Sequence, residues 1–155
     1  MRVTFTPDPS PRSIASALGK LSEDFRDWRP ALRKLVPVMV RNQQDNLSGP
    51  SLGTPWPPLS EATVRRKGHA AQMVLSGELL ARAAGGARQI SRTHVSIGDI
   101  PKYGYMLNYG ADGRYSARPW IGWADRALQE ATGILSSHST TLLERAIGRM
   151  GGQSV

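Results

Sequence analysis

The sequence predicts an α+β fold in which long N-terminal and C-terminal helices surround a small antiparallel sheet, with extended loops and an N-terminal arm. Two patterns support this prediction. Apolar residues recur every three or four positions near both ends of the chain, and apolar and polar residues alternate over residues 87–98. A chain of 155 residues is long enough to bury a core without disulfides.

The chain is expected to form one domain, residues 1–155, whose ends differ in composition from its centre. Residues 1–11 are rich in proline and predict an extended arm, residues 12–148 form the expected core, and residues 149–155 predict a loose tail. The sequence contains no apolar run of membrane-spanning length and no apolar segment of a secretory signal, so the expected compartment is the cytoplasm. Disulfides and thiolate metal sites are excluded because the sequence contains no cysteine.

The N-terminal part of the core predicts two amphipathic helices. Its apolar residues follow a spacing of three and four: Ile14, Leu18, Leu21, Phe25, Trp28, Leu32 and Leu35. Because Pro30 and Pro37 interrupt this pattern, we expect one helix over 13–28 and a second over 30–47. Ser13 is the expected N-cap of the first helix, and Pro30 is expected in the first turn of the second.

The rest of the core is predicted to alternate loops with short elements. Four prolines and two glycines predict a loop over 48–58. The other expected elements are a helix over 61–67 capped by Ser60 and ended by Gly68, a strand over 72–75, a helix over 76–83, a half-buried strand over 87–98, an aromatic segment over 101–109 and a strand over 118–121. A last helix is expected from Trp123 onward, bent or frayed by the poor helix formers at 133 and 136–141.

The charge of the chain is positive and dispersed. Lys and Arg number 20 against 12 Asp and Glu, which gives a net charge of +8 with neutral histidines. The longest basic run is Arg65-Arg66-Lys67. Such charge suits an anionic neighbour, which can be a nucleic acid or an acidic protein. A DNA-binding module is therefore one functional alternative, although no helix-turn-helix pattern accompanies the charge.

No catalytic or metal-binding constellation can be assembled from the sequence. His69, His94 and His138 are isolated and lack metal-ligand spacing. The nucleophile-elbow and phosphate-binding glycine motifs are also missing from the sequence. We therefore expect no catalytic residue, no metal, no cofactor and no enzymatic activity.

The informative residues are glycines, prolines and aromatic residues in four segments. These are Gly-Thr-Pro-Trp-Pro-Pro-Leu-Ser-Glu-Ala-Thr at 53–63 with Lys67 following, Val-Leu-Ser-Gly-Glu-Leu at 74–79, Tyr-Gly-Tyr-Met-Leu-Asn-Tyr-Gly at 103–110 and Arg-Pro-Trp-Ile-Gly at 118–122. Their order and spacing resemble the phage virion morphogenesis family, which includes the tail completion G protein of Mu-like phages and S protein of P2-like phages. The resemblance covers about residues 30–148. The chain departs from the family pattern at Leu107-Asn108, where a His-Gln pair is usual, and at Trp120, where Phe is usual.

The resemblance implies a structural protein of a tailed-phage neck that acts in assembly, as a tail completion, tail terminator or head–tail joining protein. It implies a homo-oligomeric ring, six-fold in the favoured case and twelve-fold in the alternative. The implied partners are neighbouring neck proteins (a connector, adaptor or stopper) and the tail tube, with packaged DNA nearby in the bore and no membrane. The implied location is the neck or tail of the virion, after assembly in the bacterial cytoplasm.

Two sets of residues are singled out. Trp56 and Trp120, beside Pro57 and Pro119, are predicted to anchor their loops to the core; the alternative for Trp56 is an anchor for a partner. The candidate partner contacts are Arg65, Arg66, Lys67, Arg114 and Arg118. We expect these five to face acidic surfaces of neighbouring proteins, where long-range attraction speeds docking; a solvated outer surface is the alternative for each.

Overall fold

A computed structural model describes residues 9–53, 55–73, 77–110 and 116–151, and the structural statements below concern these residues. The elements are α1 (Pro11–Asp24), α2 (Arg29–Ser48), α3 (Glu61–Lys67), α4 (Glu78–Ala83), β1 (Ala87–Ile90), β2 (Val95–Ile97), α5 (Lys102–Tyr109) and α6 (Asp125–Gly151). Along the chain, long helices precede and follow one two-stranded antiparallel sheet. The predicted α+β class is confirmed.

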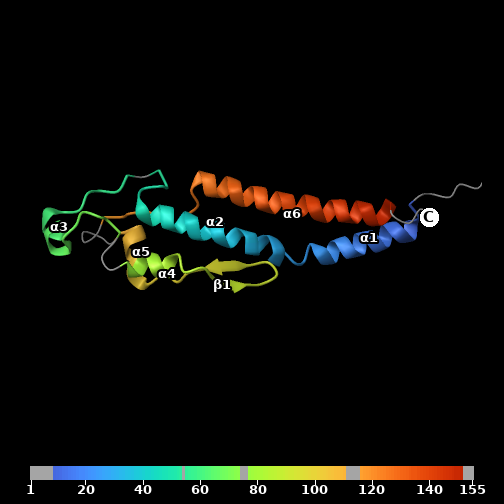
Figure 1. The fold of residues 1–155 in the computed structure, drawn as a ribbon, viewed down its shortest axis with the longest axis horizontal. Helices are drawn as coiled ribbons and strands as arrows, with labels where there is room; N and C mark the ends of the chain where they lie inside the picture. The colour runs from blue at the N-terminus through green and yellow to red at the C-terminus, as the bar shows by residue number, and fades with distance from the viewer. Residues whose placement is uncertain (1–8, 54, 74–76, 111–115, 152–155) are drawn as a thin grey trace, which may run out of the picture.

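The elements lie side by side in an elongated, thin arrangement (Figure 1). Helix α2 runs through the middle, with α6 along one side and the β-hairpin and α4 packed against the other. Helix α1 continues beyond α2 and packs against the C-terminal half of α6, whereas α3 lies at the opposite end of the molecule. Every element therefore has few neighbours, and much of the apolar surface lies near solvent.

The boundary between the arm and α1 lies earlier than the sequence predicts. The N-cap is Ser10, whose Oγ accepts a hydrogen bond from the backbone N–H of Ser13 at 3.2 Å. The prediction that Ser13 caps the helix is wrong, because Pro11 already occupies a helical first-turn position that needs no N–H partner. Residues 1–8 of the predicted arm lie outside the described residues.

Helix α1 ends at Asp24, four residues before the predicted end. The backbone N–H of Trp28 donates to the Arg92 carbonyl of the hairpin turn at 2.7 Å, so it does not continue the helix. Asp27 Oδ1 then accepts from the backbone N–H of Arg29 at 3.1 Å and helps to start α2. The two-helix prediction is correct, and α2 continues through Pro37, whose missing N–H falls on the exposed side of the helix.

In the middle of the chain the predicted helices over 61–67 and, in its described part, over 76–83 are found as α3 and α4, whereas the predicted strands are not found as predicted. Helix α3 has the predicted Ser60 cap, and it ends at Gly68 as predicted, with Gly68 in the left-handed conformation. The strand predicted over 87–98 is a hairpin, because Ser91 donates its backbone N–H to the His94 carbonyl at 2.8 Å and reverses the chain. The alternating pattern over 87–98 continues through this turn without a break, so the sequence pattern gives no sign of the turn. The aromatic segment after it forms α5.

No strand forms over 118–121, because the Asn108 side chain binds the backbone N–H groups that a strand would use. Gln72 and Met73 are not in a strand, and residues 74–76 of the predicted strand and helix lie outside the described part of the chain. Helix α6 is continuous from Asp125 to Gly151, so it is not interrupted at the poor helix formers at 133 and 136–141. The helix ends within the predicted tail, and residues 152–155 of that tail lie outside the described residues. Hydroxyl groups in α6 donate to carbonyls four residues earlier and thus remain compatible with the helix.

Two apolar clusters form the core. The first surrounds Trp120 and consists of Leu47, Trp56, Met73, Leu79, Ala83 and Trp120. The second lies between α2 and α6 and consists of Leu32, Leu35 and Ala131, with half-buried hairpin residues against it. Among the described helices, none is long and apolar enough to cross a membrane.

Candidate assembly surfaces

Trp120 is the centre of the cluster that fixes α5. Its side chain is completely buried, and its Nε1–H donates to the Gly104 carbonyl at 3.2 Å. A Cβ atom on Gly104 would lie 3.0 Å from Leu79 Cδ1 and 3.3 Å from Trp120 Cζ2. Gly104 therefore permits the inner face of α5 to pack directly on the indole ring.

Three buried asparagines hold the segment after Trp120. Asn108 Oδ1 accepts from the backbone N–H groups of Trp120 and Ile121, each at 2.8 Å. Asn46 Nδ2 donates to the carbonyls of Trp120 and Gly122, each at 2.9 Å. Asn42 on α2 also donates to the Gly122 carbonyl, at 2.7 Å. These side chains replace the strand partners that residues 120–122 lack.

Trp56 closes the same cluster from the proline-rich loop. It is buried, and its Nε1–H donates to the Pro119 carbonyl at 3.1 Å. Arg118 Nη2 and Gln72 Nε2 both donate to the Pro57 carbonyl, at 3.1 and 3.0 Å. The structure thus places both tryptophans in the core, and it brings Trp56 and Pro57 into contact with Pro119 and Arg118.

The predicted partner contacts lie in different environments. Arg118 is buried, and Lys67 Nζ donates to the Ala71 carbonyl at 2.5 Å, so both side chains bind nearby carbonyl groups. Burial, together with the nearby charge of Arg118, lowers the pKa of the Lys67 ammonium. Arg65 and Arg66 are exposed on α3, and Arg65 is 3.9 Å from Glu61. Arg114 lies outside the described residues, and a partner for any of the five stays a prediction.

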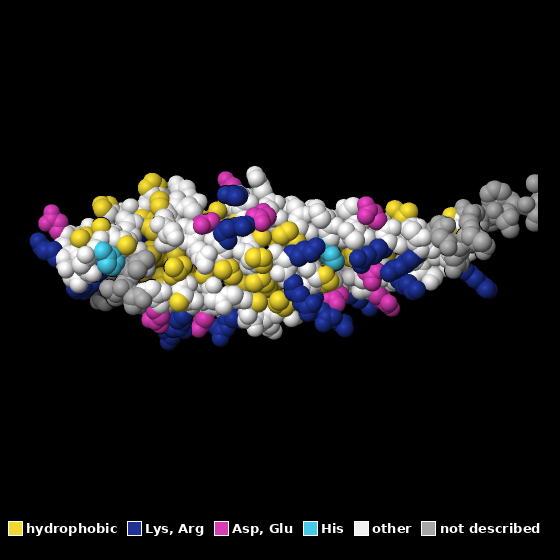
Figure 2. Space-filling model, in the orientation of Figure 1, with side chains coloured by type: hydrophobic (Ala, Val, Ile, Leu, Met, Phe, Trp, Pro, Cys, Tyr) yellow, Lys and Arg dark blue, Asp and Glu magenta, His cyan; other side chains and the backbone are white. Residues whose placement is uncertain are grey.

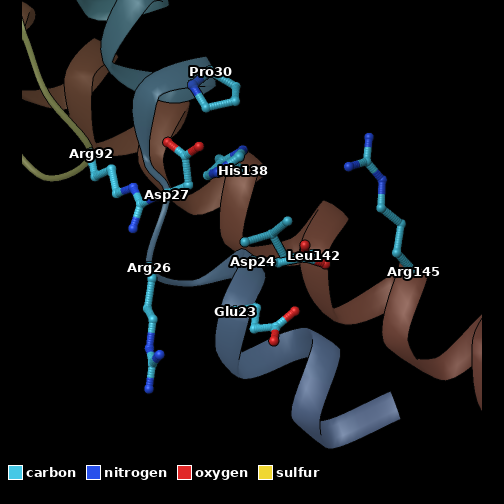
Figure 3. Close-up of a pocket in the computed structure, with 9 residues that line it drawn as sticks. All are labelled: Glu23, Asp24, Arg26, Asp27, Pro30, Arg92, His138, Leu142 and Arg145. Carbon is cyan, nitrogen blue, oxygen red and sulfur yellow. The ribbon is translucent and has the colours of Figure 1, made fainter. Parts of the chain in front are cut away.

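A groove of about 460 Å³ lies where the α1–α2 turn, the hairpin turn and α6 meet (Figure 3). Its lining residues are Glu23, Asp24, Arg26, Asp27, Pro30, Arg92, His138, Leu142 and Arg145. Asp27 pairs with Arg29 at 2.5 Å, and the hydrogen bond from Arg29 lowers the pKa of Asp27 to about 2. Figure 3 shows Arg26 and Arg145 pointing away from each other. These two arginines therefore cannot bind one small anion together.

Basic side chains gather around this junction. Figure 2 shows Lys and Arg side chains over the region where α1 meets α2. Asp24 and Asp27 are already paired, with Arg149 at 3.0 Å and Arg29 at 2.5 Å. The sequence spreads these basic residues over three distant segments, and the fold brings them to one place.

An ion-pair network joins the hairpin to α4 beside α5. Asp99 accepts from Arg82 at 2.6 Å and from Arg88 at 2.9 Å, and Arg82 also pairs with Glu78 at 3.2 Å. The hydrogen bond from Arg82 is the main reason that the pKa of Asp99 is lowered. Burial, followed by the charge of Glu78, raises the pKa of Tyr103 on α5.

Large apolar side chains remain exposed in groups on α5 and α6, and singly at Leu18 on α1 and at Trp123 before α6. Four of them lie on the outer face of α5, and we call this group the tyrosine patch: Tyr103, Tyr105, Met106 and Tyr109. Three more lie on α6: Leu128, Leu143 and Ile147. A contiguous exposed apolar patch on a protein surface is typical of an interaction site.

The described residues contain no group of three or more His, Cys, Asp or Glu that could hold a metal ion. The model of the phage virion morphogenesis family matches residues 10–139. The chain belongs to the phage virion morphogenesis family. This match confirms the resemblance found in the four motifs, and it indicates a virion-associated role in phage morphogenesis. Searches of curated proteins and of solved structures found no match.

Two features of these surfaces were not predicted from the sequence: the buried asparagines of α2 and the tyrosine patch. Asn42 and Asn46 lie four positions apart on the buried face of α2, in line with Leu35 and Val38. Two amides on an apolar helix face are a usable signal, because a buried amide needs hydrogen-bond partners from a neighbouring segment. The exposed tyrosine patch was not predicted, since the sequence segment 101–109 was assigned no element.

Proposed function

We propose that this member of the virion morphogenesis family assembles as a ring in the neck of a tailed phage, as a tail completion, tail terminator or head–tail joining protein. Family membership supports a role in morphogenesis. The observation that supports a role in assembly is the thin shape of the subunit together with its exposed apolar groups on α5 and α6. The role consists of binding neighbouring proteins, without a catalytic step.

The shape of the subunit explains why assembly would stabilise it. A thin arrangement buries less of its apolar surface than a rounder domain of the same length. A ring forms when one surface of each copy binds a different surface of the next and the rotation closes. Two separate apolar surfaces on one chain are what such a contact requires.

The proposal is tested by removing the gene for this protein from its phage and examining the lysate by negative-stain electron microscopy. The expected result is filled heads and tails that accumulate separately, with joined particles restored when the protein is supplied from a plasmid. Normal numbers of joined, infectious particles without the protein would refute the proposed neck role.

Charge reversal on α3 is expected to impair joining without impairing folding. The structure identifies Arg65 and Arg66 as the exposed pair, whereas Lys67 binds loop carbonyls and is left unchanged. The double variant Arg65→Glu, Arg66→Glu should keep its thermal unfolding temperature and lower the yield of joined particles several-fold, because an acidic partner is repelled. Reversal of Arg12 and Lys20, exposed on α1 at the other end, is the matched control. Equal losses in both variants would show that only net charge matters.

The alternative of a DNA-binding module has one specific observation in its favour. The basic side chains at the α1–α2 junction form a local positive region (Figure 2). The groove there also contains Glu23, Asp24 and Asp27, whose carboxylates offset part of this positive charge. A gel-shift assay with duplex DNA, repeated at rising salt concentrations, tests this alternative, because binding through phosphate groups weakens steeply with salt. Tight, salt-sensitive binding would support the DNA-binding module. We expect only weak binding, which the Arg65→Glu, Arg66→Glu variant does not change.

A further inference from the structure

We propose that the tyrosine patch on α5 of one copy packs against the outer face of α6 in the next copy. This contact rests on the proposed ring and names the two surfaces that repeat around it. The outer face of α6, called here the α6 stripe, consists of Leu128, Thr132, Ser136, Thr140, Leu143 and Ile147. All six residues are exposed.

The tyrosine patch is a rigid surface. Gly104 and Asn108 on the inner face of α5 are buried and hydrogen-bonded to the Trp120 segment, so the outer face is fixed relative to the core. Tyrosines lose little conformational freedom on binding and are enriched among the residues that contribute most to interfaces. Tyr109 is the most exposed member, at 73%.

The α6 stripe is a long uncharged surface. With 3.6 residues per turn, its six members lie within an arc of about 120°, and they extend over about 29 Å of helix. None of them is charged, whereas Arg126, Glu130 and Glu144 lie on the adjoining part of the helix surface. An aromatic patch can be covered by such a face without burying an unpaired charge.

The layers of the fold place the two surfaces apart. Helix α6 lies along one side of α2, and α5 lies with α4 on the other side (Figure 1). A copy therefore cannot cover its own patch with its own stripe. A neighbour that presents its α6 can do so, and the same step repeated generates a head-to-tail series that closes into a ring.

The sizes of the surfaces agree with a contact between two copies. Three tyrosines and a methionine, of which Tyr109 is mostly exposed and the others about half exposed, offer roughly 400 Å² of surface. One side of a standard protein interface buries about 800 Å², of which about 57% is apolar. The tyrosine patch thus supplies most of the apolar area that one partner contributes.

Two charges at the edges of these surfaces have opposite sign and no ion-pair partner among the described residues. Lys102 is exposed on the same face of α5 as the tyrosine patch, and Glu144 adjoins Leu143 on α6. Docking of α5 on the C-terminal part of the α6 stripe would bring these charges near each other. An acidic or nucleic-acid partner for the patch would leave the tyrosines against polar groups, so a second copy fits better.

Cysteine cross-linking tests the contact cleanly, because the natural chain contains no cysteine. The single variants Tyr109→Cys and Leu143→Cys are purified separately, mixed in equal amounts and oxidised. Both positions are well exposed, so both variants should fold. Ser137→Cys is the matched control, since it is exposed on the same helix but turned about 120° from Leu143.

The expected result is a disulfide-linked dimer in the Tyr109→Cys and Leu143→Cys mixture. The yield should be roughly tenfold above that of the mixture with Ser137→Cys, because a disulfide needs Cα atoms within about 7 Å. Lys102→Glu should lower ring formation measured by light scattering, and adding Glu144→Lys to the same chain should restore it. Equal cross-linking to both α6 positions, or cross-linking of Tyr109→Cys mainly to itself, overturns the proposal.

The cross-linking experiment tests the contact between α5 and α6, and removal of the gene tests the neck role separately. Rings that form without the cross-link overturn the pairing of α5 with α6 and leave the neck role standing. A protein that remains monomeric overturns the pairing as well. Normal phage assembly without the gene refutes the neck role, whatever the cross-links show.

Discussion

Replacing Trp120 with alanine should cost about 3–5 kcal/mol of folding free energy and yield mostly insoluble protein. The side chain is completely buried between α5 and the segment that Asn46 and Asn108 hold. A cavity at this place removes the surface on which Gly104 packs. Urea unfolding of the soluble fraction measures the loss.

Trp120→Phe is the control for that variant. It keeps an aromatic ring in the core but removes three ring atoms as well as the hydrogen bond from Nε1–H to the Gly104 carbonyl, so a smaller loss of about 1–3 kcal/mol is expected. If Trp120→Ala were as stable as Trp120→Phe, the ring would not be the centre of the core, and the account of how α5 is positioned would be wrong.

Replacing Asn108 with alanine should destabilise the protein by about 2–4 kcal/mol, because two backbone N–H groups lose their acceptor inside the protein. The affected donors belong to Trp120 and Ile121. Gln129→Ala, at an exposed position on α6, is the matched control and should have little effect. The free energy of unfolding in urea separates the two variants, and equal stabilities would show that water replaces the amide.

The helical part of the fold was largely predictable, since periodic apolar residues and helix caps are local signals. The two N-terminal helices and α3 with Ser60 and Gly68 follow from such signals. The hairpin and the irregular segment 118–121 could not be predicted from such local signals. The hairpin depends on pairing between β1 and β2, and the segment depends on hydrogen bonds to the distant Asn108 side chain. Asn108 is the clearest example: its side chain takes the place of a neighbouring strand.

The candidate surfaces were less predictable than the fold. The sequence singled out Lys67 and Arg118 as partner contacts because they are basic and lie near the proline-rich loop and the Asp-Gly turn. In the structure both turn inward, since the loop carbonyls around Pro57 and Ala71 need donors. The gathering of arginines at the α1–α2 junction and the exposure of α5 arise from the arrangement of elements, which no single stretch of sequence contains.

The central claim is that this protein forms a ring in the phage neck, and cryo-electron microscopy of virions that contain it tests this most directly. The account predicts a closed ring of density at the head–tail junction into which the subunit fits, with α5 of each copy against α6 of the next. Density for the protein only in the capsid shell or at the distal tail end, or its absence from the virion, would contradict the account.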